Sequence, residues 1–142
     1  MSDKAKRLAR VLRVRTLQLG LTQADEARAA ARMADEMALH DRIVQLAHAV
    51  APVKAPATTA MTLHASAHYR DRLHASVDIA QRRVAQADDG LARAKSATLE
   101  ARRDQSAVEK LIARADAAQA LRELRAMENA PPVRRPKRHD PC

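Results

Sequence analysis

The sequence predicts an all-α protein, a long two-helix antiparallel coiled-coil hairpin. Three observations predict this fold. Alanine supplies much of the apolar content, two long proline-free segments flank a short proline-containing one, and the second long segment has a sustained heptad repeat. The length of 142 residues is enough for one domain.

The composition favours helices over a globular core or a sheet. Hydrophobic residues make up 46% of the chain, yet it has one Tyr and no Phe or Trp. Alanine buries little area but has the highest helix propensity. Two glycines leave few tight turns for a sheet. No run approaches the roughly 18 apolar residues of a transmembrane helix, and Cys142, the only cysteine, has no partner for an intrachain disulfide.

Prolines separate the two predicted helices. Pro52 and Pro56 interrupt the chain after a long proline-free segment, because proline lacks an N–H group and clashes inside a helix. Thr58 or Thr59 is suited to cap the helix that follows. A short bend between two long helices makes them pair antiparallel.

These boundaries define the expected organisation. The hairpin covers 1–130, and a basic disordered tail covers 131–142, where prolines recur. Within the hairpin we expect helices at about 3–50 and 60–129, joined by a bend at about 51–59. The second helix is longer by about 20 residues, so one of its ends should extend past the first helix.

The second helix carries the clearest pattern. Two rows of positions seven apart, offset by four, form a heptad whose period of about 3.5 residues predicts left-handed supercoiling around a partner helix. Thr98 and Gln105 are polar members that can fix the register. Gly90 lies beside the seam and could allow close approach or bending. The first row is Leu73, Ala80, Ala87, Ala94, Ala101, Val108 and Ala115, and the second is Val77, Val84, Leu91, Thr98, Gln105, Ile112 and Gln119.

The first helix has apolar stripes that drift around its surface, and its alanines are expected to face the alanine row of the second helix. We predict that these stripes make the packing face. One stripe is Val14, Leu17, Leu21, Ala24, Ala31 and Ala38. The second is Ala27, Ala30, Ala34, Met37 and Val44, and the third is Leu39, Ile43, Leu46 and Val50.

The net charge of +9 is concentrated at the two ends of the chain. Residues 1–20 hold six basic residues against Asp3, a net of +5, and residues 131–142 hold four against Asp140, a net of +3. In a hairpin, the two ends should meet and form a strongly positive tip on a nearly neutral shaft. Such a field favours an acidic protein surface, anionic lipid or nucleic acid.

No catalytic motif is present, so we expect a non-enzymatic protein with no small-molecule substrate and no cofactor. His64 and His68 share a helix face, with His74 beyond them, but no acidic residue or cysteine completes a zinc site. The pairs Arg82-Arg83 and Arg102-Arg103 lie among acidic residues, which indicates solvated ion pairs four residues apart along the helix. We therefore predict no metal site.

Three stretches resemble a known family. They are the start with Arg7-Leu8, Val11-Leu12 and Arg15, the alanine- and acid-containing stretch Gln23-Ala24-Asp25-Glu26-Ala27, and the late run Glu109-Lys110-Leu111-Ile112-Ala113-Arg114. Together with the unequal hairpin, they resemble the FliJ family, soluble stalk proteins of flagellar export that are related to the YscO proteins of type III secretion. The resemblance covers about residues 4–129.

The resemblance implies a mechanism and a location. The hairpin would enter the ring of the hexameric export ATPase FliI, contact the export gate FlhA and escort export chaperones. It would act in the cytoplasm, peripherally at the export apparatus of the inner membrane. We predict that the positive tip makes the protein contact through Arg7, Arg10, Arg13 and Arg15.

Two other partners stay open at this point. The alternative function is a basic coiled-coil protein that binds nucleic acid or acts as a scaffold. A single aromatic residue offers no stacking platform for single strands, which argues against nucleic acid. The basic amphipathic start around Leu8–Arg15 is also compatible with peripheral membrane contact, although it lacks Trp and Phe anchors.

Overall fold

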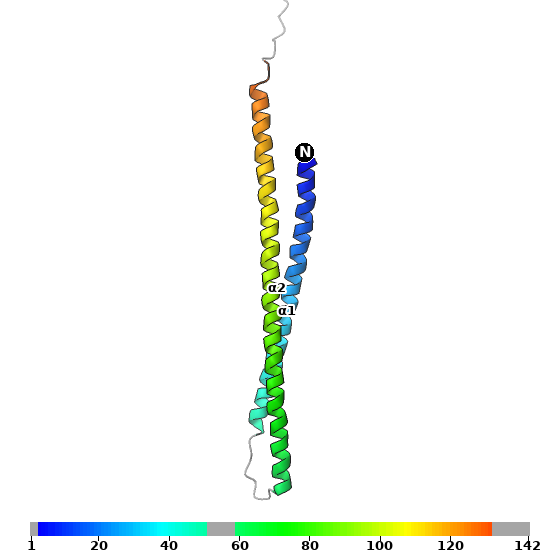
Figure 1. Cartoon of the computed structure of the whole chain (residues 1–142), viewed down its shortest axis with the longest axis vertical. Coiled ribbons are helices and arrows are strands. Elements are labelled where there is room, and N and C mark those ends of the chain that lie inside the picture. Colours follow the sequence, from blue (N-terminus) through cyan, green and yellow to red (C-terminus); the bar gives the residue numbers. More distant parts are fainter. Residues whose placement is uncertain (1–2, 51–58, 132–142) are drawn as a thin grey trace, which may run out of the picture.

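The computed structural model describes residues 3–50 and 59–131. They form two α-helices that lie side by side and run antiparallel: α1 (Asp3–Ala49, 47 residues) and α2 (Ala60–Glu128, 69 residues) (Figure 1). There is no strand within these ranges. The predicted all-α hairpin is therefore confirmed, and both helices lie within one residue of their expected bounds. The expected bend, apart from Thr59, and the expected tail, apart from Pro131, lie outside the described residues.

The start of α2 is capped by one of the two threonines expected to do so. Thr59 has an extended backbone (φ −80°, ψ 157°), and its hydroxyl accepts a hydrogen bond from the backbone N–H of Thr62 at 3.4 Å. The cap satisfies one of the amide groups that a helix start leaves unpaired. At the other end, the backbone N–H of Asn129 donates to the carbonyl of Arg125 at 3.0 Å and closes the last turn.

The heptad of α2 packs against α1 as predicted. Every member of both rows from Leu73 to Ala115 is buried or half-buried. The three most buried side chains of the described chain all belong to these rows: Ala80 is 3% exposed, Thr98 4% and Val108 8%. Gln119, the last predicted member, is exposed because α1 begins at about its level.

The packing face of α1 differs from the predicted stripes. Apart from Ala9 and Val44, its half-buried residues alternate at spacings of three and four from Ala5 to Val50, which is a heptad matching that of α2. Many of its members are polar, and for this reason the sequence reading missed it. The members are Ala5, Leu8, Leu12, Arg15, Leu19, Thr22, Glu26, Ala29, Met33, Glu36, His40, Ile43, Ala47 and Val50.

The first predicted stripe, from Val14 to Ala38, is exposed at all six positions, on the side of α1 away from α2. Most of the other two stripes is exposed as well. Val44, Ile43 and Val50 are half-buried, and only Ile43 and Val50 belong to the packing heptad. The expectation that the alanines of these stripes face α2 was therefore wrong.

There is a physical reason for this choice of face. The large residues of the outward stripe end at Leu21, and Arg28 and Asp35 follow at its next heptad positions. That stripe cannot match a heptad over the full length of α1. The chosen face has large apolar residues near both ends, such as Leu12 and Ile43, so it can pair with α2 along its whole length.

Three side-chain contacts between the helices show their register. Arg15 Nη1 lies 2.8 Å from Asp104 Oδ2, and Arg83 Nη2 lies 2.8 Å from Glu36 Oε1. Gln105 Nε2 also donates to the Thr16 hydroxyl at 3.3 Å. In each pair the residue numbers add to about 120, as a constant antiparallel register requires. In this register, large apolar side chains of the two helices meet toward both ends of the paired region. Most of the polar seam residues of α1 lie between these ends.

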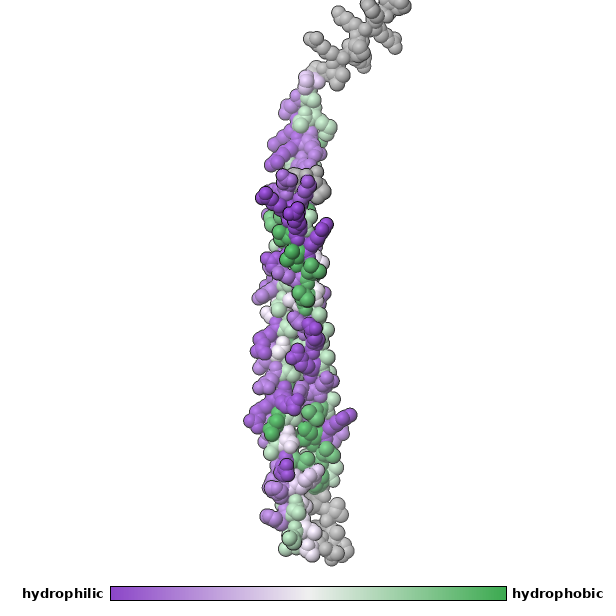
Figure 2. Space-filling view, turned by 90° about the vertical axis from the view of Figure 1, so that its right-hand side faces the viewer, coloured by the Kyte–Doolittle hydropathy of each residue, from purple (hydrophilic) through white to green (hydrophobic). Residues whose placement is uncertain are grey.

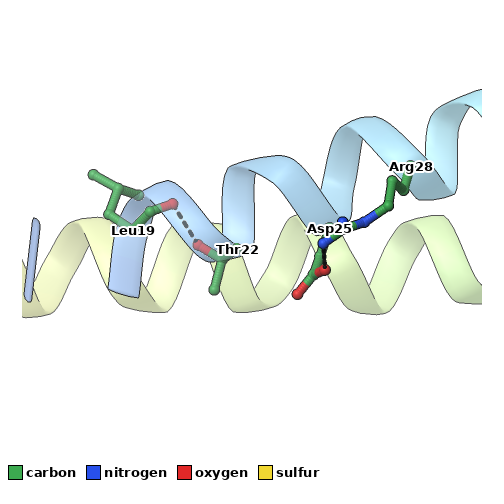
Figure 3. A network of polar contacts seen from close by, with 4 residues as sticks. All are labelled: Leu19, Thr22, Asp25 and Arg28. Carbon is green, nitrogen blue, oxygen red and sulfur yellow. Dashed lines mark hydrogen bonds and ion pairs between the residues drawn. The ribbon is translucent and has the colours of Figure 1, made fainter. Parts of the chain in front are cut away.

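The polar side chains of the seam differ in how well their hydrogen-bonding groups are paired. The Thr22 hydroxyl donates to the Leu19 carbonyl of its own helix at 3.0 Å (Figure 3). In the same way, the Thr98 hydroxyl donates to the Ala94 carbonyl at 3.1 Å. Glu36 is less well satisfied, since its Oε2 atom is buried without a hydrogen-bond partner among the described residues. A buried oxygen atom without a partner costs free energy at this level of the seam.

Gly90 is not a point of close approach. A Cβ atom built on Gly90 meets nothing within 4 Å, and its φ is not positive. The expectation that this glycine lets the helices come together there was wrong. It belongs instead to an open hollow between the helices that is also lined by Ala29, Ala87 and Ala94, because small side chains leave space at this level.

Candidate partner-binding surface

The four arginines predicted to contact a partner are divided by the fold. Arg15 lies in the seam, where its guanidinium pairs with Asp104 at 2.8 Å and donates to Gln18 Oε1 at 2.9 Å. Arg7, Arg10 and Arg13 are exposed, and none of them makes an ion pair with the described residues. Three of the four are therefore available to a partner, and Arg15 serves the hairpin itself.

A group of exposed apolar residues follows these arginines along α1. Val14 is 53% exposed, Leu17 69% and Leu21 64%, and all three lie on the face turned away from α2. Leu17 and Arg13 also line a shallow depression. Figure 2 looks onto the side where the N-terminal half of α1 lies in Figure 1, and it shows strongly hydrophilic side chains followed by a hydrophobic patch.

We call this surface the α1 outer patch and define it by six residues: Arg7, Arg10, Arg13, Val14, Leu17 and Leu21. The sequence reading identified the arginines but assigned the apolar members to packing against α2. The signal in the sequence was the lack of large apolar residues on the outward stripe after Leu21, whereas Met33 and Ile43 continue the seam.

The positive charge of Arg7, Arg10 and Arg13 lies along the side of the shaft. Ala5 lies beside Asp116 and Gln119, so α2 continues to Glu128, about 15 Å beyond the start of α1. The two basic ends of the chain were expected to meet at one tip. The unequal helices separate the start of α1 from the end of α2. The basic residues Arg134, Arg135, Lys137 and Arg138 lie outside the described residues, so the meeting of the two basic ends stays a prediction.

The two arginine pairs of α2 do not form the expected ion pairs along the helix. Arg83 reaches across to Glu36 on α1, and Asp104 reaches across to Arg15. No ion pair joins two residues of α2 within the described chain. Arg83 and Asp104 flank the packing face of α2, where a long side chain meets the partner helix.

The histidine cluster lies near the bend. His64, His68 and His74 are all exposed on α2. No group of three or more His, Cys, Asp or Glu residues able to hold a metal occurs within residues 3–50 and 59–131. In the same ranges, neither helix has a stretch apolar enough to span a membrane.

One open hollow between the helices lies at mid-length. The open hollow around Gly90 has charged side chains at its edges, among them Arg32, Arg93 and the ion-paired Arg83 and Glu36. Positive and negative groups thus face the same small space, and the local field has no single sign. The α1 outer patch differs, because all its charged members have the same sign.

Comparison of the chain with family models, curated proteins and solved structures found no match.

Proposed function

We propose that the protein is a non-enzymatic stalk of a flagellar or other type III export apparatus. In this proposal it engages the export ATPase ring and the export gate, and it escorts export chaperones. It works in the cytoplasm, peripherally at the inner membrane. The observation that carries the proposal is the shape: a narrow hairpin in which a 69-residue helix extends past its 47-residue partner.

The dimensions of the hairpin support this role. At 1.5 Å per residue, α2 is about 100 Å long, and the hairpin is two helices wide. A rod of this kind fits a narrow ring and acts through its surface, without needing an enclosed pocket. Its charged side chains outside the seam are mostly solvated, which suits a shaft that contacts partners only in places.

The α1 outer patch supplies a contact with the ring. Arg7, Arg10 and Arg13 are exposed and offer positive charge to an acidic lining. Arg15 is not included, because its charge is already neutralised by Asp104. The proposal thus assigns the ATPase contact to three of the four arginines predicted from the sequence.

The test is a binding measurement with the export ATPase encoded in the same genome, at about 0.15 M salt where weak charge contacts are screened. The triple charge reversal Arg7→Glu, Arg10→Glu and Arg13→Glu should weaken binding about tenfold or more. A matched control reverses three arginines nearer the bend, Arg42, Arg72 and Arg82, and should leave the affinity unchanged. Circular dichroism checks that both variants keep their helices.

Absence of binding by the unmodified chain, or equal binding by both triple variants, would sink the proposed role. The alternative, a nucleic-acid-binding coiled coil, makes a different prediction. Duplex DNA would then be retained at the same salt concentration, and the reversal at Arg7, Arg10 and Arg13 would abolish that retention.

A further inference from the structure

We propose that the α1 outer patch is a docking site for an acidic amphipathic helix of another protein. The inference rests on the proposed function in one respect, since the same three arginines serve both. What it adds is the kind of element that binds: a helix whose acidic residues lie over the arginines and whose apolar residues lie over Val14, Leu17 and Leu21.

The first argument is that no acidic residue lies near these arginines along the helix, since residues 4–24 contain no Asp or Glu. Arg15, Arg28 and Arg83 each have a carboxylate partner in the chain. Those of the outer patch have none among the described residues. They recur every three residues on the same side of α1, a rise of about 4.5 Å per step. A line of like charges with this spacing matches carboxylates spaced three or four residues apart on a facing helix.

The second argument is the spacing of the apolar members. Val14, Leu17 and Leu21 are separated by three and four residues, the spacing of a coiled-coil seam. They remain half or more exposed in the folded hairpin, because α2 occupies the other side of α1. A seam that the chain's own partner helix does not cover fits the apolar face of a helix from elsewhere.

A second copy of this chain fits the patch poorly. Antiparallel pairing that puts Leu17 of one copy against Leu21 of the other also puts Arg10 against Arg28. The opposite-charge pair Arg13–Asp25 that it makes competes with the ion pair between Asp25 and Arg28 within each copy. Parallel pairing puts each arginine of the patch beside its own copy. Both arrangements bring like charges together, which costs free energy at an interface.

A membrane and a nucleic acid each fit only half of the patch. The apolar part spans about two turns and has no Trp or Phe to anchor it at a lipid interface. Phosphates would satisfy the arginines, but would leave the three apolar side chains without contacts. A helix that is acidic on one part and apolar on another satisfies both.

The probe is a synthetic, fluorescently labelled peptide of three heptads, with leucine at the seam positions and glutamate beside them. Fluorescence anisotropy with the full chain should show saturable binding. The variant Leu17→Ser, Leu21→Ser should weaken it about tenfold, as expected for central apolar contacts. The matched control is Leu111→Ser, Leu124→Ser, which removes two similarly exposed leucines from α2 and should have no effect.

Two further peptides test the two halves of the patch. A peptide with serine in place of leucine should lose most of the binding, and one with lysine in place of glutamate should lose nearly all of it. Equal binding by the serine peptide would show that charge alone acts and would overturn the inference. Loss of binding in the α2 control variant as well would also overturn it.

The other occupants have their own outcomes. Co-sedimentation with phosphatidylglycerol vesicles, or retention on duplex DNA, without peptide binding would overturn the inference in favour of a membrane or nucleic acid. A dimer in analytical ultracentrifugation that Leu17→Ser, Leu21→Ser dissociates would assign the patch to a second copy.

The ATPase measurement separates this inference from the proposed function. Peptide binding without ATPase binding would remove the export role and keep the docking site. ATPase binding that Leu17→Ser, Leu21→Ser leaves unchanged, together with no peptide binding, would remove the docking site and keep the export role.

Discussion

The two sides of α1 differ in a way that reverses the usual rule for helices. The side that packs against α2 includes Arg15, Glu26 and Glu36, whereas the outward side near the start of the helix carries Leu17 and Leu21 in solvent. The inward side packs because its apolar residues are spread along the whole helix. The outward side is more apolar only over about two turns, from Val14 to Leu21.

This comparison shows that the apolar content of a helical face does not by itself identify the packing face. A long coiled coil needs a continuous match of period and length. Apolar residues that do not pack within the hairpin can then contact a partner, as in the α1 outer patch. Three sets of substitutions test the comparison, in order of decreasing expected effect.

Introducing a charge in the seam and, separately, on the outward side of α1 should give the largest difference in stability. Val108, 8% exposed, lies opposite Leu12 in the register of the seam. Val108→Asp buries a carboxylate and should lower the free energy of unfolding by about 3 kcal/mol. Leu17→Asp is the control, because Leu17 is 69% exposed, and it should change stability by less than about 0.5 kcal/mol. Urea unfolding followed by circular dichroism measures both, and similar losses in the two variants would contradict the assignment of the two sides.

Removing a charge from the middle of the seam should stabilise the hairpin. Glu36 has a buried Oε2 atom without a hydrogen-bond partner among the described residues, and Val84 lies opposite it in the register. Glu36→Leu should raise the free energy of unfolding by about 1 kcal/mol, even though the ion pair with Arg83 is lost. The neighbouring exposed Asp35→Leu should give no such gain. A lower melting temperature for Glu36→Leu would show that the ion pair matters more than the apolar contact.

The ion pair between Arg15 and Asp104 should have the smallest effect. Its side chains are 40% and 52% exposed, so solvent screens the attraction. A double-mutant cycle with Arg15→Ala and Asp104→Ala should give a coupling of about 0.5 kcal/mol, falling toward zero at about 1 M salt. The pair Arg7→Ala and Asp104→Ala should show no coupling, because Arg7 faces outward. A coupling that does not respond to salt would contradict the exposed position of the pair.

Much of the hairpin could be predicted because its causes are local. Proline positions, alanine content and the Thr59 cap depend on neighbouring residues, so the helix bounds followed from them. The rows of α2 could also be read, because nearly every member from Leu73 to Ala115 is apolar. The seam of α1 could not, because polar residues interrupt it and a stronger local stripe competes with it.

The candidate site was predicted in part for the same reason. Charge is visible in the sequence, so Arg7, Arg10 and Arg13 were identified. Whether an arginine forms an ion pair across the seam depends on the residue opposite it on the other helix. The ion pair between Arg15 and Asp104 could therefore not be predicted from the sequence. The apolar half of the α1 outer patch was missed because its residues were assigned to the hairpin.

The sequence by itself determined that this chain is two long helices, where they begin and end, and which face of α2 packs. The tertiary structure decided which face of α1 meets it, which charges are neutralised across the seam, and how far α2 extends past the start of α1. The physical reason is that helix formation and capping depend on residues a few positions apart. The choice of a packing face depends on the match between two helices over their whole shared length.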